Sequence, residues 1–445
     1  MSRIAIIGYN SVELVNIIVN IWNQQNSVVM LDWRMPVGKV RELMMECGSH
    51  DIYIDSDIIN KYEELGDYKI VVHQFSSIRN EDRYLTYEIY SSFTPNYSEE
   101  EAVVIFSSGT TGMAKGVCLS HFAINTNADA IIDYMNIQSN DVIYIVKSLT
   151  HSSTFVGELL VALKQGIPAI IGLNIVPPRY TLGMLRQYEV TLFCTNPTLL
   201  RMYVREIEKY PAEFPKLRNM YVSGAILSDE LYCEAKVAFR GINICNMYGL
   251  SEAGPRVTCQ TGHESKNTVG KPIKDVQIGI ANEQGHFVNN LEIGEVYVHS
   301  KSCFSGYITD QCKREKTYWH KSGDIGYLTE NEELVILGRK DDVINIDSHN
   351  VVPVTIENVV LTNECVDECS VVEVPKGIIT CAITLKTDID VNEVSNGIHC
   401  LCKKNLAVYE IPRRIIVLDN IPKNANGKVD NILLVKEINK KYGNT

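Results

Sequence analysis

Apolar runs that predict strands alternate with helical segments over residues 1–60 and again over 140–240. In the first stretch, 3–7 and 27–31 are apolar, and 11–22 between them carries apolar residues at helical spacing. Such alternation predicts βαβ units, in which consecutive strands run parallel and helices cover the sheet. We therefore expect an α/β fold whose large N-terminal domain has mixed or parallel sheets with flanking helices.

The rest of the chain changes character twice. Residues 268–340 are rich in short β signals and glycine turns, which predicts a β-rich subdomain. After residue 340 the pattern becomes that of a small α+β module. The length of 445 residues also favours more than one domain. We expect an N-terminal domain over 1–340 and a small, mobile C-terminal domain over 341–445.

Composition narrows the class of protein. The chain is 45% hydrophobic and 22% charged, as is usual for globular enzymes, and its net charge of −12 argues against nucleic acid as a partner. It has no run of eighteen apolar residues, so no membrane partner is expected. The 13 cysteines lack the paired CxxC spacing of a zinc site, and free thiols favour a cytoplasmic location.

A loop rich in hydroxyls and glycine follows the apolar run 103–106. It reads Ser107-Ser108-Gly109-Thr110-Thr111-Gly112-Met113-Ala114-Lys115-Gly116. Hydroxyl and backbone N–H groups donate to phosphate oxygens, glycine permits a close approach, and lysine adds positive charge. No Ser or Thr follows Lys115 to hold Mg²⁺, which excludes the GxxxxGK[ST] loop of kinases and GTPases. The loop therefore predicts a polyphosphate site of another kind.

This loop closely resembles the signature of the adenylate-forming superfamily, which includes acyl- and aryl-CoA ligases, adenylation domains of nonribosomal peptide synthetases, and luciferases. Further segments resemble motifs of the same superfamily, in the same order: 246–254, 321–327, 338–342 and 422–430. A resemblance over 10–36 also implies that the chain lacks several dozen residues that members usually have at the N-terminus. The set of motifs spans most of the chain, which makes it specific.

The resemblance implies that the chain uses ATP and Mg²⁺. In it, the loop Ser107–Gly112 and Lys115 would hold the phosphates, and Glu252 would hold Mg²⁺, a cation that prefers oxygen ligands. The other residues that it assigns to ATP are Gly224 and Ala225 beside adenine, Tyr248 stacked on adenine, Ser251 at the α-phosphate, Asp324 on the ribose hydroxyls, and Arg339 on ribose and phosphate. Lys428 matches the catalytic lysine, and Asp341 matches the hinge of the C-terminal domain.

The same resemblance places His151, Ser153, Met247, Gly249 and Arg256 around a small carboxylic acid substrate. Ser153 replaces the Asp that pairs with the ammonium group of amino acids, so an α-amino acid is not expected. His151 either lines the carboxylate end of the pocket, as a catalytic residue, or is a packed core residue. Arg256 either meets a hydroxyl or second carboxylate of the substrate or lies at the surface. We expect an aryl or acyl acid, with a hydroxylated aromatic acid of secondary-metabolite or siderophore biosynthesis as the working guess.

For the second half-reaction the resemblance implies transfer of the acyl group to a phosphopantetheine thiol. Asn345 and Ser348 replace a lysine and a glycine that the family usually has after the hinge. The sequence favours a stand-alone ligase that loads a carrier protein, with free CoA as the alternative acceptor. A noncatalytic nucleotide-binding homologue is the alternative of a different class, although the presence of Lys428 argues against it.

Overall fold

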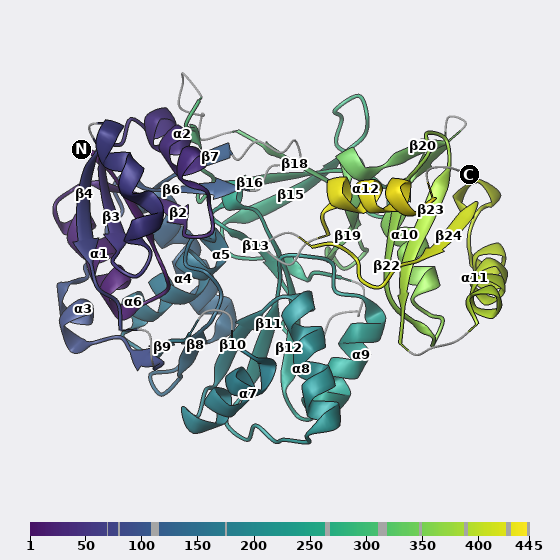
Figure 1. The fold of residues 1–445 in the computed structure, drawn as a ribbon, viewed down its shortest axis with the longest axis horizontal. Coiled ribbons are helices and arrows are strands. Elements are labelled where there is room, and N and C mark those ends of the chain that lie inside the picture. Colours follow the sequence, from purple (N-terminus) through teal and green to yellow (C-terminus); the bar gives the residue numbers. More distant parts are fainter. Residues whose placement is uncertain are drawn as a thin grey trace.

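The fold is seen in a computed structural model, which describes residues 1–68, 70–78, 81–107, 115–173, 176–262, 268–309, 318–346, 349–386, 390–423 and 429–442. Sheets flanked by helices make up the N-terminal three quarters, and a smaller group of elements follows at the other end of the molecule (Figure 1). Within the described segments, no helix combines the length and the apolar character that crossing a membrane requires.

The first sheet has the order β17-β7-β6-β2-β1-β3-β4 and confirms the predicted parallel core. Its parallel strands are β1 (Arg3–Gly8), β2 (Ser27–Asp32), β3 (Asp51–Asp55), β4 (Val71–Phe75) and β6 (Glu101–Ser107). Antiparallel β7 (Lys115–Ser120) and β17 (Gly306–Tyr307) complete one edge. The helical segments α1 (Val12–Asn23), α2 (Val37–Cys47) and η1 (Ile59–Tyr68) connect its early strands. Ser11 caps α1 by accepting from the Leu14 N–H at 3.1 Å, which fixes where this helix starts.

The second sheet has the order β14-β13-β12-β11-β10-β8-β9-β5 and is parallel through its centre. Its central strands are β8 (Ile143–Ile145), β9 (Ala169–Ile171), β10 (Leu192–Thr195), β11 (Asn219–Val222) and β12 (Asn243–Gly249). Its antiparallel edges are β5 (Arg83–Tyr84), β13 (Arg256–Cys259) and β14 (Lys271–Pro272). The helical segments of this region are α3 (Tyr87–Ser92), α4 (His121–Met135), α5 (Ser152–Thr154), η2 (Phe155–Leu160), α6 (Val161–Gln165), α7 (Pro178–Gln187), α8 (Pro197–Lys209), α9 (Asp229–Ala238) and η3 (Ser251–Ala253).

A third, antiparallel sheet confirms the predicted β-rich subdomain. Its order is β15 (Val276–Ala281), β16 (Gly294–Ser300), β18 (His320–Leu328) and β19 (Leu334–Arg339). Strand β19 ends at Arg339, where η4 (Lys340–Asp342) leads out of this sheet.

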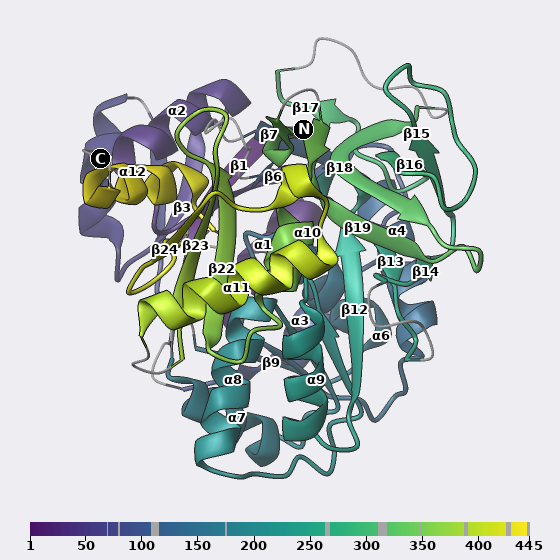
Figure 2. The same ribbon diagram turned by 90° about the vertical axis from the view of Figure 1, so that its right-hand side faces the viewer.

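The elements after η4 form the predicted α+β module. They are β20 (Ile344–Ile346), β21 (His349–Val351), α10 (Pro353–Val360), β22 (Val366–Glu373), β23 (Ile379–Leu385), α11 (Val391–Asn405), η5 (Val408–Glu410), β24 (Arg414–Val417) and α12 (Asn431–Tyr442). Strands β22, β23 and β24 make one sheet, and α11 lies across it (Figure 2). The buried apolar clusters of this module draw only on residues from 344 onward, so the module has a core of its own.

Charged side chains join this C-terminal module to helices α8 and α9, which lie beside its sheet (Figures 1 and 2). Arg205 of α8 pairs with Asp367 of β22, and Arg201 lies 3.9 Å from the same carboxylate. Lys386, just after β23, lies 2.7 Å from Glu230 of α9. These ion pairs link segments more than 150 residues apart in the chain.

Candidate active site

Tyr248, Asp324 and Arg339 come from three strands and form one hydrogen-bonded cluster. The Tyr248 hydroxyl donates to Oδ2 of Asp324 at 2.5 Å, and Nη1 of Arg339 donates to Oδ1 at 3.0 Å. The register of β18 and β19 pairs Asp324 directly with Arg339, which explains why the two side chains meet. A carboxylate has about four acceptor positions, so one carboxylate such as that of Asp324 can accept from several donors at once.

The backbone around Asp324 is shaped for this contact. Gly323 has φ +72°, in the left-handed region that glycine adopts without strain. A Cβ at Gly323 would lie 2.9 Å from Nη2 of Arg339, so the glycine also makes room for the guanidinium. The Asp324 N–H donates to the Ser322 hydroxyl at 2.9 Å, which holds the turn.

The charges in this cluster change the proton affinity of its members. Burial, followed by the charge of Asp324, raises the pKa of Tyr248 well above its usual value. Burial lowers the pKa of Arg339, but the charge and hydrogen bond of Asp324 outweigh it and leave the pKa raised. Tyr248 is therefore a neutral donor, and Arg339 is a permanent cation beside Asp324.

A second cluster joins Glu252 to Lys115 through Tyr307. The Tyr307 hydroxyl donates to Oε1 of Glu252 at 3.0 Å, and Nζ of Lys115 lies 5.3 Å from the centroid of the tyrosine ring. Strand β17 carries Tyr307 to the edge of the first sheet by pairing Tyr307 with Val117 of β7. The sequence analysis missed Tyr307, although the segment Gly306-Tyr307 precedes the predicted ribose motif and could have drawn notice as a glycine–aromatic pair.

Glu252 fits the predicted Mg²⁺ ligand. Magnesium in nucleotide sites is usually held by one or two carboxylates together with phosphate oxygens and water, so a single carboxylate beside the phosphate loop suffices. Among the described residues, no group of three His, Cys, Asp or Glu side chains is arranged to hold a metal on its own. Glu252 and Tyr248 lie four residues apart, on η3 and at the end of β12, so the residues predicted to bind the metal and the nucleotide share one turn.

A hydrogen bond ties the predicted α-phosphate residue to the predicted acid pocket. The hydroxyls of Ser251 and Ser152 lie 2.9 Å apart, and Ser152 sits between His151 and Ser153 in the sequence. His151 is partly buried. The loop that begins at His151 thus meets Ser251 directly, and Ser152 is a further residue that sequence analysis missed.

Arg256 lies in the interior, so the surface alternative for it is wrong. Its side chain is 1% exposed, at the start of β13. Nη1 donates to the Ser223 hydroxyl at 3.3 Å, and Nη2 donates to the Ser153 carbonyl at 3.5 Å. Arg256 therefore bridges the segment of Ser153 and the end of β11, which precedes Gly224.

The other predicted residues occupy varied positions. Met247 is buried in the main core and accepts a 3.4 Å hydrogen bond from Tyr134, whereas Gly249 and Ala225 are exposed. Gly224 has φ +99°, and a Cβ at Gly249 would lie 2.1 Å from the Pro255 carbonyl, so both positions require glycine. Asp341 is exposed on η4, at the start of the C-terminal module.

Several predicted residues lie outside the part of the chain that the structure describes. They are Ser108, Gly109, Thr110, Thr111, Gly112, Ser348 and the predicted catalytic Lys428, and the side chains of Ser107 and Asn345 are likewise not described. Their roles stay predictions from the sequence.

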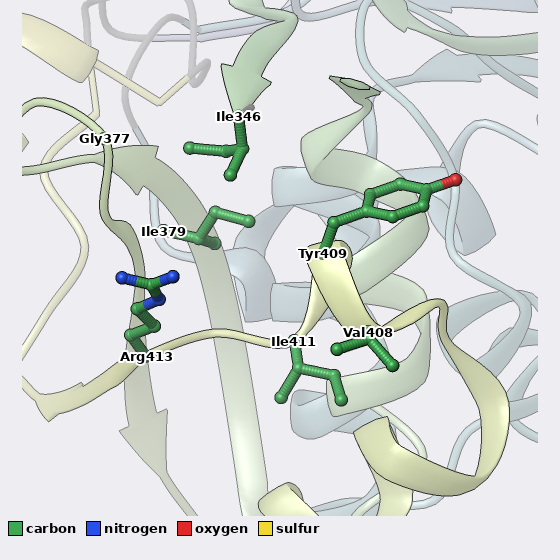
Figure 3. Close-up of a pocket in the computed structure, with 7 residues that line it drawn as sticks. All are labelled: Ile346, Gly377, Ile379, Val408, Tyr409, Ile411 and Arg413. Atoms are coloured by element: carbon green, nitrogen blue, oxygen red, sulfur yellow. The ribbon is translucent and has the colours of Figure 1, made fainter. Parts of the chain in front are cut away.

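The C-terminal module carries a pocket of about 310 Å³, whose lining includes no residue of these clusters (Figure 3). It is lined by Ile346, Gly377, Ile379, Val408, Tyr409, Ile411 and Arg413. Ile346 belongs to the segment after the hinge that the sequence analysis linked to the thiol acceptor. The lining is apolar apart from Arg413, the Tyr409 hydroxyl and the backbone.

Comparison with known proteins agrees with this geometry. A family model described as AMP-binding enzyme matches residues 1–308, and one described as AMP-binding enzyme C-terminal domain matches 355–428. An oxalate–CoA ligase of Arabidopsis thaliana is 26% identical over 350 residues, 75% of this chain and 67% of that ligase. An indoleacetate–CoA ligase of Aromatoleum aromaticum is 23% identical over 449 residues, 96% of this chain and 86% of that ligase.

The fold is also that of a solved structure. An o-succinylbenzoate coenzyme A synthetase from Bacillus subtilis, in complex with ATP and magnesium ion, superposes with a TM-score of 0.80 at 21% identity. The superposition covers 98% of this chain and 89% of the synthetase.

Proposed function

Because the chain belongs to the AMP-binding enzyme family, we propose that it activates a carboxylic acid with ATP and transfers the acyl group to the thiol of coenzyme A. One observation carries this proposal. Tyr248 contacts Asp324, the carboxylate predicted to bind ribose. Four residues further along the chain, Glu252, the carboxylate predicted to bind the metal, contacts Tyr307. One turn therefore brings both carboxylates into the same site. A site that binds only a sugar does not need the second cluster, in which a carboxylate and a lysine lie on either side of Tyr307.

The first half-reaction forms an acyl adenylate. A carboxylate oxygen of the acid attacks the α-phosphorus of ATP, the bond to the β-phosphate breaks, and pyrophosphate leaves. Asp324 holds the ribose, Ser251 orients the α-phosphate, and Lys115 stabilises the leaving pyrophosphate, because positioned cations and donors lower the barrier most where charge builds up. Glu252 would hold Mg²⁺, and the bound ion would supply positive charge that offsets the phosphate charge. Lys428 bridges the attacking carboxylate and the phosphate in this proposal.

The second half-reaction breaks the adenylate. The sulfur of the acceptor attacks the acyl carbon, the acyl–phosphate bond breaks, and AMP leaves. We propose that the C-terminal module rotates about Asp341 between the two steps, which withdraws Lys428 and admits the thiol. The exposure of Asp341 supports a hinge at this point.

Coenzyme A is our first choice of acceptor, in place of the carrier protein that the sequence analysis favoured. The two relatives and the solved structure named above are all coenzyme A ligases or synthetases by name. The exclusion of α-amino acids has support from Arg256, because a buried cation beside Ser153 repels an ammonium group. A hydroxylated aromatic acid and a siderophore-type setting stay predictions from the sequence.

The test is acid-dependent ATP–pyrophosphate exchange, followed by loss of the free coenzyme A thiol. Lys428→Ala is expected to bind ATP but to lower exchange by about 10²–10³-fold, the usual cost of removing a charge that stabilises a transition state. Lys436→Ala, an exposed lysine on α12, is the matched control and should leave exchange unchanged. Equal exchange in all three proteins would contradict the role of Lys428, absence of acid-dependent exchange from the wild type would favour the noncatalytic homologue, and thiol loss only with a loaded carrier protein would favour the carrier.

A further inference from the structure

The guanidinium of Arg256 is buried without a compensating carboxylate. Its bonds to the Ser223 hydroxyl and the Ser153 carbonyl are 3.3 and 3.5 Å long, at the weak end of the hydrogen-bond range, and Nε has no hydrogen-bond partner. No carboxylate of the described residues forms an ion pair with it. A buried cation in this condition is costly unless an anion joins it.

The nearest carboxylate is already engaged. Glu158, on η2, is fully buried and lies 3.0 Å from Nζ of Lys147. Burial raises the pKa of Glu158, against the opposing charges of Lys147 and Arg256. With Glu158 ionised, Lys147 and Arg256 leave an excess of one positive charge, and with Glu158 protonated the excess is larger.

Neighbouring titratable groups do not remove this excess. Burial raises the pKa of the Cys194 thiol to about 12, and it raises that of Tyr134 well above its usual value. Both groups are therefore neutral at physiological pH and leave the positive charge in place.

The guanidinium lies next to a residue that is predicted to line the acid pocket. It contacts Ser153, the neighbour of Ser152, and Ser152 bonds to Ser251 at the expected α-phosphate position. A Cβ at Gly157 would lie 3.1 Å from Nη2, so η2 packs closely against this charge. Arg256 is therefore a cation held beside the segment that is predicted to contact the acid.

Resting on the proposed function, we propose that the substrate is a dicarboxylic acid whose second carboxylate binds Arg256. A carboxylate accepts two parallel hydrogen bonds from a guanidinium and neutralises its charge. A hydroxyl accepts a hydrogen bond but has no charge with which to neutralise the guanidinium. The long bonds to Ser153 and Ser223 are the contacts that the carboxylate replaces. One carboxylate then reacts with ATP while the other is held.

The experiment compares matched acids in ATP–pyrophosphate exchange with the wild-type chain. The panel pairs oxalate, malonate, succinate and glutarate with acetate, propionate, butyrate and valerate, and adds benzoate and hydroxybenzoates. We expect kcat/KM for the best dicarboxylate to exceed that of its monocarboxylate partner by at least about 30-fold, because a buried charge pair favours an acid with a second carboxylate over one without it.

Arg256→Met should abolish that preference and raise KM for the dicarboxylate, with KM for ATP unchanged, and Arg256→Lys should restore part of it. Arg240→Met, at an exposed arginine, is the control. Exchange with monocarboxylates or hydroxybenzoates alone overturns the dicarboxylate proposal and leaves the proposed function standing. Exchange with no acid overturns both. The wild-type panel gives its answer even where a variant does not fold.

Discussion

Tyr307 donates a 3.0 Å hydrogen bond to Glu252, across 55 residues of sequence. The same ring faces Lys115, whose ammonium lies 5.3 Å from its centroid. One tyrosine therefore orients the predicted metal ligand while its ring attracts the predicted phosphate cation. Tyr307 acts through these neighbours, as a positioning residue.

Tyr307→Phe is expected to lower pyrophosphate exchange about tenfold at limiting Mg²⁺ and less at saturating Mg²⁺. The loss of a hydrogen bond to a charged group, about 1.5–3 kcal/mol at most, leaves Glu252 poorly oriented. Exchange rates measured against Mg²⁺ concentration test this. Tyr297→Phe, whose ring contacts Phe287 in the third sheet, is the matched control. An unchanged Mg²⁺ dependence would show that Tyr307 has no part in the metal site.

Asp324→Asn is expected to raise KM for ATP by about 10–100-fold with a smaller effect on kcat, since it weakens charge-assisted bonds to ribose and leaves Arg339 without its partner. Tyr248→Phe removes only one hydrogen bond and should raise KM by less. Isothermal titration with ATP gives the affinities directly. Equal binding of ATP by wild type and Asp324→Asn would rule out a ribose role for this cluster.

Gly323→Ala is expected to lower both stability, by about 1–2 kcal/mol, and affinity for ATP, because φ is +72° and the new methyl group would press on Arg339. Gly285→Ala separates the two causes, since Gly285 has φ +80° but nothing within 4 Å of its Cβ position. Both variants should melt at lower temperature, and only Gly323→Ala should bind ATP more weakly. The same affinity loss in both would refute the role of the Arg339 contact.

Glu357 is expected to make stability depend on pH near neutrality. Burial, helped by the charge of Asp342 and opposed by the bond from the Val371 N–H, raises its pKa to about 7. The folded state therefore holds a proton that the unfolded state has lost above about pH 4.3. The contribution of Glu357 to the free energy of unfolding is therefore fully present below about pH 4.3 and is lost as the pH rises through about 7.

Denaturant unfolding of the full chain at pH 5, 6, 7 and 8 measures this effect. The stability of wild type relative to Glu357→Gln should fall over this range, because the amide keeps the contact with Val371 but does not titrate. Glu364→Gln, at an exposed position of the same module, is the control. A constant difference between wild type and Glu357→Gln would contradict the raised pKa.

The parallel core was predictable because its signals are local. Strand 3–7, helix 11–22 and strand 27–31 were expected from periodicity alone, and β1, α1 and β2 match them to within one or two residues. Each element there is defined by its own apolar spacing, and its start by neighbours such as Ser11. Tyr248, Asp324 and Arg339 were each singled out because each stands in a motif, but their hydrogen bonds to one another were not predicted.

The remaining parts of the site depend on contacts that local patterns do not contain. Tyr307 reaches Glu252 only because a two-residue strand pairs with β7, about 190 residues earlier in the chain. Arg256 could be assigned to pocket or surface with equal ease, since one charged residue after Pro255 looks the same in either place. Its burial follows from the packing of η2 and β11 around it, which three-dimensional structure alone reveals.

Ion pairs, rather than a shared apolar core, connect the two modules. Exposed ion pairs such as those of Asp367 and Lys386 contribute about 0–1 kcal/mol each, and salt weakens them over a screening length of about 8 Å. Because the apolar clusters of the C-terminal module draw only on its own residues, the rotation that we propose would expose no apolar core shared with the N-terminal domain. We expect added salt to ease that proposed rotation, because it weakens the ion pairs between the two modules.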